Sequence, residues 1–400
     1  MARKKPLDRR LPSINATVSE ATTFNARIFR KLKRALDSDP GVDLLSLFPS
    51  QYSARLSNMT NINLSDADTH TADCALPDQG NAETSPNQDD IRFLIHPSDK
   101  IDILEPPSTA VQDLISSKMV TPTCLTDSEK DSQFNTSLLR LLRESKVVGK
   151  SPIPSRRMVV KCNVHIVAKL VWGAEDFTEH TTLRYLLEHK PNLPVSKPLG
   201  LLRMGPVLMT FMSYLPGTTL DAKWAGLSVD QKSSVCEQLD AIFGDLRTLR
   251  FANGVSLGGV GGQGCKDQRR HLRRNSGPIL NVEEFVDFQF SNPNYGSSTF
   301  IEFLRAFTRV NAHQIVFTHG DLRPENILVE VTEDTKCTVT GLIDWEDSGF
   351  YPEYHESTKL TNCMGTTEEW DWLRFLPPCI SPHKFPVEWL LDYVWGRHLE

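Results

Sequence analysis

The sequence lacks several features that would assign the protein to a well-defined class. It has no run of about 18 apolar residues, so no membrane span is predicted. Its start, MARKKPLDRR, has no apolar core of a secretory signal, and the eight cysteines show neither a C-x-x-C pair nor zinc spacing. Both features are typical of a cytoplasmic protein with reduced thiols. The net charge of −6 lacks the basic excess that nucleic-acid binding requires.

Glycine is also scarce where a nucleotide-binding loop would need it. The stretch before the first predicted hairpin, VVGKSPIP, contains a single glycine, Gly149. The single G-x-G-x-x-G match, residues 259–264, follows a polar loop instead of a strand, and Cys265 stands where a Walker A loop requires lysine. We therefore interpret this match as a flexible loop. The basic run over residues 266–274 is interpreted as a solvated face, with contact to an anionic substrate as the alternative.

The first third of the chain differs in composition from the rest. Residues 1–34 hold ten Lys and Arg against two acids, and residues 35–135 hold 17 acids against five bases. Such polar stretches bury too little apolar surface to offset ordering entropy, so we predict a mostly disordered extension over residues 1–135. Within it, residues 22–35 predict a basic amphipathic helix that either packs locally or contacts a partner. Residues 91–95, IRFLI, predict at most a lone strand.

Two motifs near the C-terminus carry most of the functional information. Residues 319–326 read HGDLRPEN and residues 342–346 read LIDWE. Short apolar runs beside them predict strands, so we expect Asp321, Asn326 and Asp344 to meet in one cleft. Phosphoryl transfer from ATP needs one carboxylate to orient a hydroxyl, and an amide and a carboxylate to hold Mg²⁺. Asp321 fits the first role and the other two residues fit the second; a capped turn with surface acids is the alternative.

These motifs resemble those of the aminoglycoside phosphotransferase and choline kinase-like family. The runs MSYLPGTTL, VFTHGDLRPENILV and GLIDWEDSGFYPEY carry the resemblance, which covers roughly residues 136–400. It implies an α+β, two-lobed protein-kinase-like fold. The small antiparallel-sheet lobe and hinge would span residues 136–217, and the mainly helical lobe residues 218–400. The resemblance also implies ATP and Mg²⁺ as cofactors and a small-molecule hydroxyl as acceptor.

The small lobe contains the residues that are expected to bind the nucleotide. Residues 158–171 predict a hairpin in which Lys169 follows Val-Ala, like the lysine that contacts the α- and β-phosphates in kinases. Glu179, at the start of the next helix, is placed to pair with Lys169. The alternative is that Asp176 and Glu179 only favour the N-terminus of that helix. Lys161, one strand earlier, is the competing lysine.

A second hairpin, over residues 199–212, leads into the predicted hinge. Ser213, Tyr214 and Leu215 follow it, and their backbone N–H and C=O groups are expected to bind the adenine edge. A third long element, the helix over residues 227–250, is predicted from its apolar stripe and from a capping box at its start.

Three further residues of the two motifs have predicted roles. Arg323 is expected to assist charge neutralisation near the γ-phosphate, or to pair with a carboxylate. His319 is expected to brace the catalytic loop and is not the base. Glu346 either reaches a second Mg²⁺ through water or is a satisfied surface acid.

Three functions are compatible with these motifs. The first is an ATP-dependent phosphotransferase acting on a small molecule, and the second is a non-catalytic, pseudokinase module that binds a nucleotide or a partner. A protein kinase is disfavoured because Gly320 replaces the arginine that reads a phosphorylated activation loop, and Trp345 and Glu346 replace Phe-Gly. The long stretch between hinge and catalytic loop also favours a small-molecule kinase.

Overall fold

The structure, a computed structural model, describes most of the chain beyond residue 89. The described residues are 90–119, 127–151, 156–252, 254–267, 273–275, 277–291, 293, 296–309, 313–332, 336–361 and 371–399, with a few positions between 28 and 52. The chain divides into two units, Met1–Ala82 and Glu83–Glu400, and every element discussed below belongs to the second. The helix predicted over residues 22–35, with its partner contact, lies mostly outside the described residues.

A six-stranded antiparallel sheet forms the small lobe. In spatial order its strands are β1 (Ile101–Glu105), β5 (Pro198–Met204), β6 (Val207–Ser213), β4 (Ile166–Trp172), β3 (Arg157–Lys161) and β2 (Lys146–Lys150). Both predicted hairpins are present, because β3 pairs with β4 and β5 pairs with β6. The central strands β4 and β6 are buried along most of their length, since helices cover both faces of the sheet.

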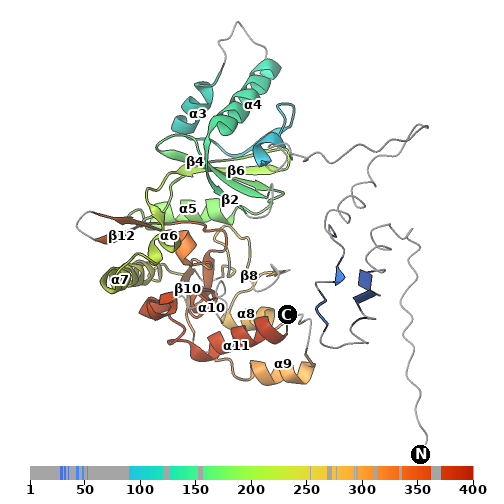
Figure 1. Cartoon of the computed structure of the whole chain (residues 1–400), viewed down its shortest axis with the longest axis vertical. Helices are drawn as coiled ribbons and strands as arrows, with labels where there is room; N and C mark the ends of the chain where they lie inside the picture. Colours follow the sequence, from blue (N-terminus) through green and yellow to red (C-terminus); the bar gives the residue numbers. More distant parts are fainter. Residues whose placement is uncertain are drawn as a thin grey trace, which may run out of the picture. The chain divides into compact units, whose positions relative to one another are not determined.

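The two faces of this sheet pack against different helices (Figure 1). On one face lie α3 (Thr109–Ser116) and α4 (Asp127–Glu144), whose apolar core includes Leu170 of β4. On the other face lies α5 (Thr178–His189), whose leucines join the core shared with the large lobe. Successive side chains of a strand alternate between its faces. Lys169, next to Leu170, therefore lies on the α5 side.

The small lobe begins earlier in the chain than predicted. Residue 136, the predicted start, lies inside α4, while η3 (Ile91–Phe93), β1 and α3 are already parts of this lobe. Residues 91–95, predicted at most as a lone strand, include this 3-10 helix, and their isoleucines are buried against α4. The composition of residues 35–135 averages this ordered segment with a polar one. The apolar side chains of the ordered segment are buried by strands that lie far along the chain, which composition does not reveal.

The large lobe is mainly helical. The predicted long helix is α7 (Val229–Leu246), with Ser228 and Gln231 forming the expected capping box. The other helices are α6 (Leu220–Trp224), α8 (Val282–Gln289), α9 (Ser298–Arg305), α10 (His355–Lys359), α11 (Pro386–His398) and the 3-10 helices η5 (Pro324–Asn326), η6 (Asp371–Arg374) and η7 (Pro378–Ile380).

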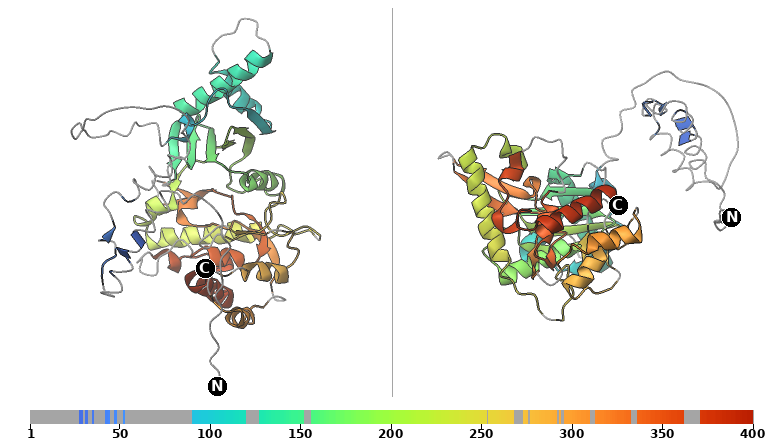
Figure 2. Two further views of the ribbon diagram at one scale, coloured as in Figure 1. Left: turned by 90° about the vertical axis from the view of Figure 1, so that its right-hand side faces the viewer. Right: turned by 90° about the horizontal axis from the view of Figure 1, so that it is seen from below.

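Short antiparallel strands connect these helices and carry the catalytic motifs. They pair as β10 (Ile315–Thr318) with β13 (Gly349–Pro352), β11 (Ile327–Val331) with both β12 (Cys337–Leu342) and β7 (Thr218–Thr219), and β8 (Lys266–Asp267) with β9 (Arg273–Arg274). Helices α8, α9 and α11 lie together at the end of the lobe away from the six-stranded sheet (Figure 2). The motif strand β12 lies toward the small lobe, where Leu342 bridges to Val195.

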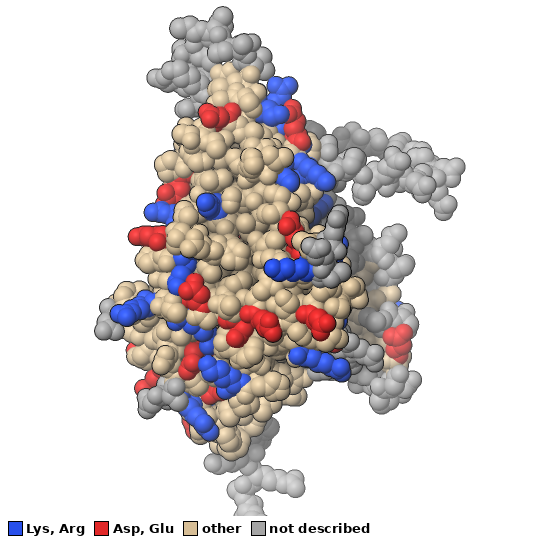
Figure 3. Space-filling view, turned by 90° about the vertical axis from the view of Figure 1, so that its left-hand side faces the viewer, with Lys and Arg blue, Asp and Glu red and all other residues tan. Residues whose placement is uncertain are grey.

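The fold class is therefore α+β with two lobes, as predicted. The first lobe combines an antiparallel sheet with helices on both faces, and the second is mostly helical. Among the described residues, no helix combines the length and apolar character needed to cross a membrane. On the face shown in Figure 3, lysines and arginines are interspersed with aspartates and glutamates.

Candidate active site

The hairpin of β11 and β12 brings the two predicted motifs together. Ile327, the first residue of β11, lies opposite Leu342, the last residue of β12. The end of the first motif therefore lies beside the second motif. Across the gap, the Ile343 N–H donates to the Asn326 carbonyl at 3.0 Å. Asn326 Nδ2 in turn donates to the Asp321 carbonyl at 2.8 Å and to Asp321 Oδ2 at 3.0 Å. Three residues predicted to share one site are therefore held by local backbone structure.

His319 links the two motifs from inside the lobe. Its Nε2–H donates to the Ile343 carbonyl at 3.0 Å, and its Nδ1 accepts the Asp321 N–H at 3.2 Å. Burial lowers the pKa of His319 to about 4, so the ring is neutral at physiological pH. A neutral ring that uses both nitrogens for bracing agrees with the predicted structural role and leaves none for catalysis.

Glu356 braces the same loop from α10, and sequence patterns did not identify it. Its Oε2 accepts the N–H groups of His319 and Gly320 at 2.6 and 3.3 Å. Gly320 has a φ of +86°, and a Cβ there would lie 2.5 Å from the Asp347 carbonyl oxygen. The loop therefore requires glycine at position 320 and cannot accept the arginine of protein kinases.

Asp344 combines backbone strain with a concentrated electrostatic environment. It has a φ of 67°, the only positive value for a non-glycine among the described residues. Such strain persists only where the surroundings impose it, and it is frequent at functional sites. Lys169 Nζ lies 2.6 Å from Oδ1, and Arg157 Nη1 lies 3.0 Å from Oδ2. Burial favours the neutral acid, but these two cations outweigh it and hold the pKa of Asp344 well below its usual range.

Lys169 makes the predicted ion pair with α5. Its Nζ lies 2.8 Å from Glu179 Oε2, and both side chains are almost fully buried. The lysine therefore joins α5, in the small lobe, to Asp344, in the large lobe. Lys161, the competing lysine, instead lies 3.4 Å above the centre of the Tyr214 ring, away from this cluster.

Asp321 lies near Asp344 and is less enclosed. Burial raises the pKa of Asp321 to about 6, although Arg323, with Nε at 3.4 Å from Oδ2, acts in the opposite direction. Its side chain is 30% exposed, so a solvent-borne hydroxyl can approach it. A carboxylate with a pKa close to neutrality is suited to proton transfer. The predicted pairing of Arg323 with a carboxylate is present.

A cavity of about 620 Å³ adjoins the cluster on the small-lobe side. Of the predicted residues, Lys169 and Glu179 line it, whereas the motif residues Asp321, Asn326 and Asp344 lie outside its lining. Its charged lining comprises Arg156, Arg157, Lys169, Lys266, Arg274, Glu175, Asp176, Glu179, Glu346 and Asp347. Five acids match the five cationic side chains, so the lining has no net positive charge; what the cavity offers a group of phosphates is its volume and the N–H donors of its arginines and lysines.

The predicted hinge is less open than expected. The N–H groups of Ser213 and Tyr214 already donate to the carbonyls of Lys197 and His165 at 2.9 and 2.7 Å. Leu215 is the one of the three whose N–H has no backbone acceptor among the described residues. Its N–H and the hinge carbonyls therefore remain the groups on which an adenine could pair.

Lys266 corrects the interpretation of the basic run. It is 4% exposed instead of solvated, and its Nζ lies 2.7 Å from Asp176 and donates to the Glu346 carbonyl. Asp176 also accepts the Thr178 N–H at 2.8 Å, but the N-cap of α5 is Phe177 and makes no side-chain cap hydrogen bond. The alternative of an Asp176–Glu179 capping pair is therefore wrong, and Glu179 pairs with Lys169 instead. Lys266 thus ties the start of α5 to the second motif. Basic composition alone predicted solvent exposure, because it does not reveal which lysine meets a buried carboxylate.

Arg157, like Glu356, was not identified from the motifs. Strand register offers a signal, because Val159 lies opposite Lys169 and directly opposed residues share a face. Arg157, two positions before Val159, is therefore on the face that carries Lys169.

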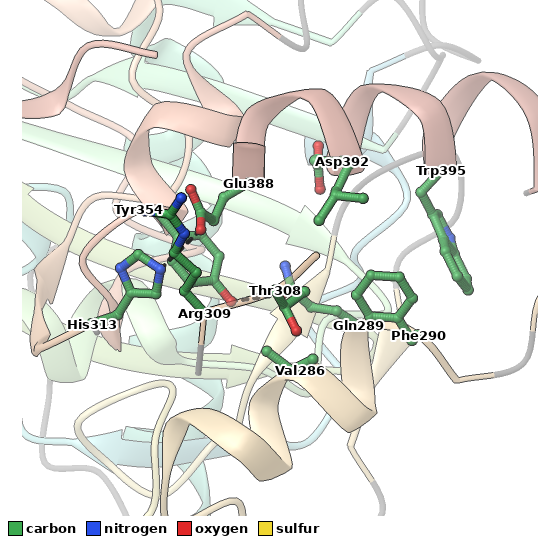
Figure 4. Close-up of a pocket in the computed structure, with 11 residues that line it drawn as sticks. Val286, Gln289, Phe290, Thr308, Arg309, His313, Tyr354, Glu388, Asp392 and Trp395 are labelled. Atoms are coloured by element: carbon green, nitrogen blue, oxygen red, sulfur yellow. Dashed lines mark hydrogen bonds and ion pairs between the residues drawn. The ribbon is translucent and has the colours of Figure 1, made fainter. Parts of the chain in front are cut away.

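A second cavity lies in the large lobe between α8 and α11 (Figure 4). Polar pairs cross it: His313 contacts Glu388 at 3.0 Å, and the Tyr354 hydroxyl donates to Gln289 at 2.8 Å. Its volume of about 20 Å³ holds about one water molecule, so it is not a substrate site.

The available donors fit a magnesium ion only in part. The amide group of Asn326 uses Nδ2 for Asp321, so its Oδ1 is the atom that would bind a metal ion, together with a carboxylate oxygen of Asp344. Among the described residues, no group of three His, Cys, Asp or Glu side chains converges to hold a metal ion. Mg²⁺ prefers oxygen ligands and commonly takes one or two from the protein and the rest from phosphates and water. The chain offers such an incomplete set.

One known family matches the part of the chain that carries both motifs. Residues 176–374 match the model of the phosphotransferase enzyme family APH, the family whose motifs the sequence resembles. No match was found among curated proteins.

Several solved structures to which the chain is similar are aminoglycoside phosphotransferases. One is APH(4)-Ia in complex with AMP-PNP and hygromycin B, at 12% identity and a TM-score of 0.42, covering 65% of this chain and 88% of that one. A second is ADP-bound APH(2'')-Ib, at 12% identity and a TM-score of 0.41, covering 67% and 90%. A third is APH(3'')-Id from Streptomyces rimosus, at 16% identity and a TM-score of 0.38, covering 65% and 98%.

Proposed function

We propose that this protein is an ATP-dependent phosphotransferase that moves the γ-phosphate to a hydroxyl group of a small molecule. The observation that carries the proposal is the convergence of Asp321, Asn326 and Asp344 beside the Lys169–Glu179 pair. Phosphoryl transfer depends on positioning and charge stabilisation, which is what these residue types supply.

Each residue has a separate task in this proposal. Asp321 accepts a hydrogen bond from the substrate hydroxyl and takes its proton as the oxygen bonds to the γ-phosphorus. The bond to the β–γ bridging oxygen breaks, and ADP leaves with that electron pair. Lys169, oriented by Glu179, binds the phosphates, and Asn326 and Asp344 are the residues that would hold Mg²⁺. When bound, the ion neutralises phosphate charge.

A small acceptor is favoured over a protein acceptor. The loop cannot hold an arginine at position 320, because a Cβ there meets the Asp347 backbone at 2.5 Å. Protein kinases of the arginine-containing class use that side chain to couple the catalytic loop to a phosphorylated segment. The acceptor itself is not selected by the fold.

A non-catalytic binding module is the second candidate. One observation favours it: both oxygens of Asp344 are engaged by cations of the chain itself, Lys169 and Arg157. If these contacts persisted with nucleotide present, the proposed metal position would stay closed.

Thermal unfolding with ATP, with and without Mg²⁺, tests the proposal. A ligand at 100 times its Kd stabilises by about 2.7 kcal/mol, and we expect such a shift to depend on Mg²⁺ and to be absent in Asp344→Ala. ADP release with a panel of amino-alcohols and aminoglycosides then separates the two candidates. Nucleotide binding without turnover for any acceptor supports the binding module, and no binding at millimolar ATP refutes the kinase.

A further inference from the structure

The guanidinium of Arg157 occupies an unusual position for a surface-strand arginine. It starts β3 on the face of Lys169, and its side chain is one-third exposed. Nη1 lies 3.0 Å from Asp344 Oδ2, and Nη2 lies 2.5 Å from Glu346 Oε1. One guanidinium thus bridges two carboxylates of the second motif and lines the cavity beside it.

This contact competes directly with any cation that approaches Asp344. Oδ1 is held by Lys169 at 2.6 Å, so Oδ2 is the oxygen that Arg157 covers. An arginine stays charged at every accessible pH and cannot vacate the carboxylate by losing its proton. The guanidinium of Arg157 moves away from Asp344 only if other anionic groups take the place of the carboxylates that it binds.

The loop before Arg157 lacks the usual means of binding phosphates. Kinase loops present backbone N–H groups to the phosphates and use glycine to bring the backbone close. Here the sequence between Ser151 and Arg157 reads SPIPSR, and its two prolines have no N–H group to donate. An arginine at the end of that loop carries five N–H donors in a fork that matches phosphate oxygens.

We infer that Arg157 is a phosphate-binding residue that exchanges Asp344 and Glu346 for the phosphate oxygens of a nucleoside triphosphate. The inference rests on the proposed function and adds a residue to it. Without nucleotide, Arg157 and Lys169 neutralise the acids that face them, Asp344, Glu346 and Glu179. A divalent cation arriving with the nucleotide takes over that charge, and the phosphates accept the guanidinium.

Calorimetric titration of Arg157→Gln with ATP, ADP and AMP, each with Mg²⁺, tests the phosphate contact. We expect ATP to bind about 10- to 100-fold more weakly than to the wild type, ADP to lose less, and AMP to be unaffected. Arg157→Lys keeps the charge without the fork and should lie between. Arg140→Gln is the matched control, because Arg140 belongs to α4, is absent from the cavity lining and has a 52% exposed side chain.

The competition is tested by titrating Mn²⁺ alone, followed by electron paramagnetic resonance. Removing Arg157 uncovers Asp344, so Arg157→Gln should bind Mn²⁺ several-fold more tightly than wild type while it binds ATP more weakly. These opposite signs are not expected from misfolding, which lowers both affinities. Unfolding midpoints of all variants complete the comparison.

The outcomes separate the inference from the proposed function. A wild type that binds MgATP, with Arg157→Gln unchanged or no different from Arg140→Gln, overturns the inference alone. Equal losses for ATP and AMP also overturn it, because they place the defect away from the phosphates. A wild type that binds no nucleotide overturns the inference and the proposed function together.

Discussion

Asp321 and Asp344 are the same residue type in one site, yet their surroundings set them apart. Burial raises the pKa of Asp321 to about 6, whereas Lys169 and Arg157 overcome burial at Asp344 and keep it ionised. Two carboxylates with separated pKa values commonly divide the roles of proton acceptor and permanent anion. The same division is expected here.

Replacing Asp321 by Asn should remove the proton acceptor and keep the shape of the loop. We expect kcat to fall about 10²- to 10⁴-fold, with the Kd for ATP unchanged, because the proposed role of the side chain is to accept the proton of the hydroxyl and not to bind the nucleotide. Steady-state kinetics and ATP titration measure the two effects. Glu325→Gln, at an exposed acid of the same loop, is the control and should keep full activity.

The pH profile reports the same carboxyl without mutation. Since the pKa of Asp321 is raised to about 6 and the ionised form is the active one, kcat/KM should fall tenfold per pH unit below about 6. An unperturbed aspartate would keep activity down to about pH 4. An acidic limb near pH 4 would therefore contradict the assignment of Asp321 as the base.

At the scale of elements, Lys266 decides how α5 meets the large lobe. Its ammonium is buried, 2.7 Å from Asp176 at the start of α5, and it donates to the Glu346 carbonyl in the second motif. Glu179 follows on the same helix and orients Lys169. Strand β8, which carries Lys266, therefore holds the start of the helix that orients Lys169.

Replacing Lys266 by Met should destabilise the fold strongly. Removing the buried ammonium breaks its ion pair with Asp176, although Arg274 stays 2.6 Å from that carboxylate. We therefore expect a loss at the lower end of the roughly 3–5 kcal/mol typical of a broken buried pair. Chemical denaturation monitored by tryptophan fluorescence measures this loss. Lys100→Met is the matched control, because the Lys100–Asp102 pair is exposed, with 84% of the lysine side chain in solvent, and should contribute less than about 1 kcal/mol. Equal effects for both variants would contradict the burial of Lys266.

At the scale of the whole molecule, the folded body starts well before the catalytic motifs suggest. Four side chains from the first third of the chain, Ile91, Ile95, Val111 and Ile115, are at most 1% exposed in the small-lobe core. Burial of one such side chain stabilises by about 1.5–3 kcal/mol, so together they approach the entire stability of a typical domain.

Two truncations test where the body begins. Deleting residues 1–82 should leave the unfolding midpoint of the second unit unchanged, because that boundary separates the two units. Deleting residues 1–119 should abolish cooperative unfolding, since it removes β1, α3 and the four core side chains. A shorter chain that still unfolds cooperatively at the original temperature would show that this segment is not part of the core.

The sequence by itself determined the residues whose roles depend on local spacing. Asp321, Asn326 and Asp344 meet because two short strands carry them to one hairpin end, and the Ser228 capping box depends on neighbours three residues apart. Type and spacing are sufficient for such features, because hydrogen bonds within a few residues enforce them.

Only the tertiary structure decided which distant charges become partners. Arg157 and Asp344 are separated by 187 positions, and Lys266 is buried against an acid from another lobe. Periodicity and composition describe how a segment meets solvent on average. They do not specify which arginine or lysine is desolvated beside which carboxylate, since that depends on strand register and on how the two lobes pack together.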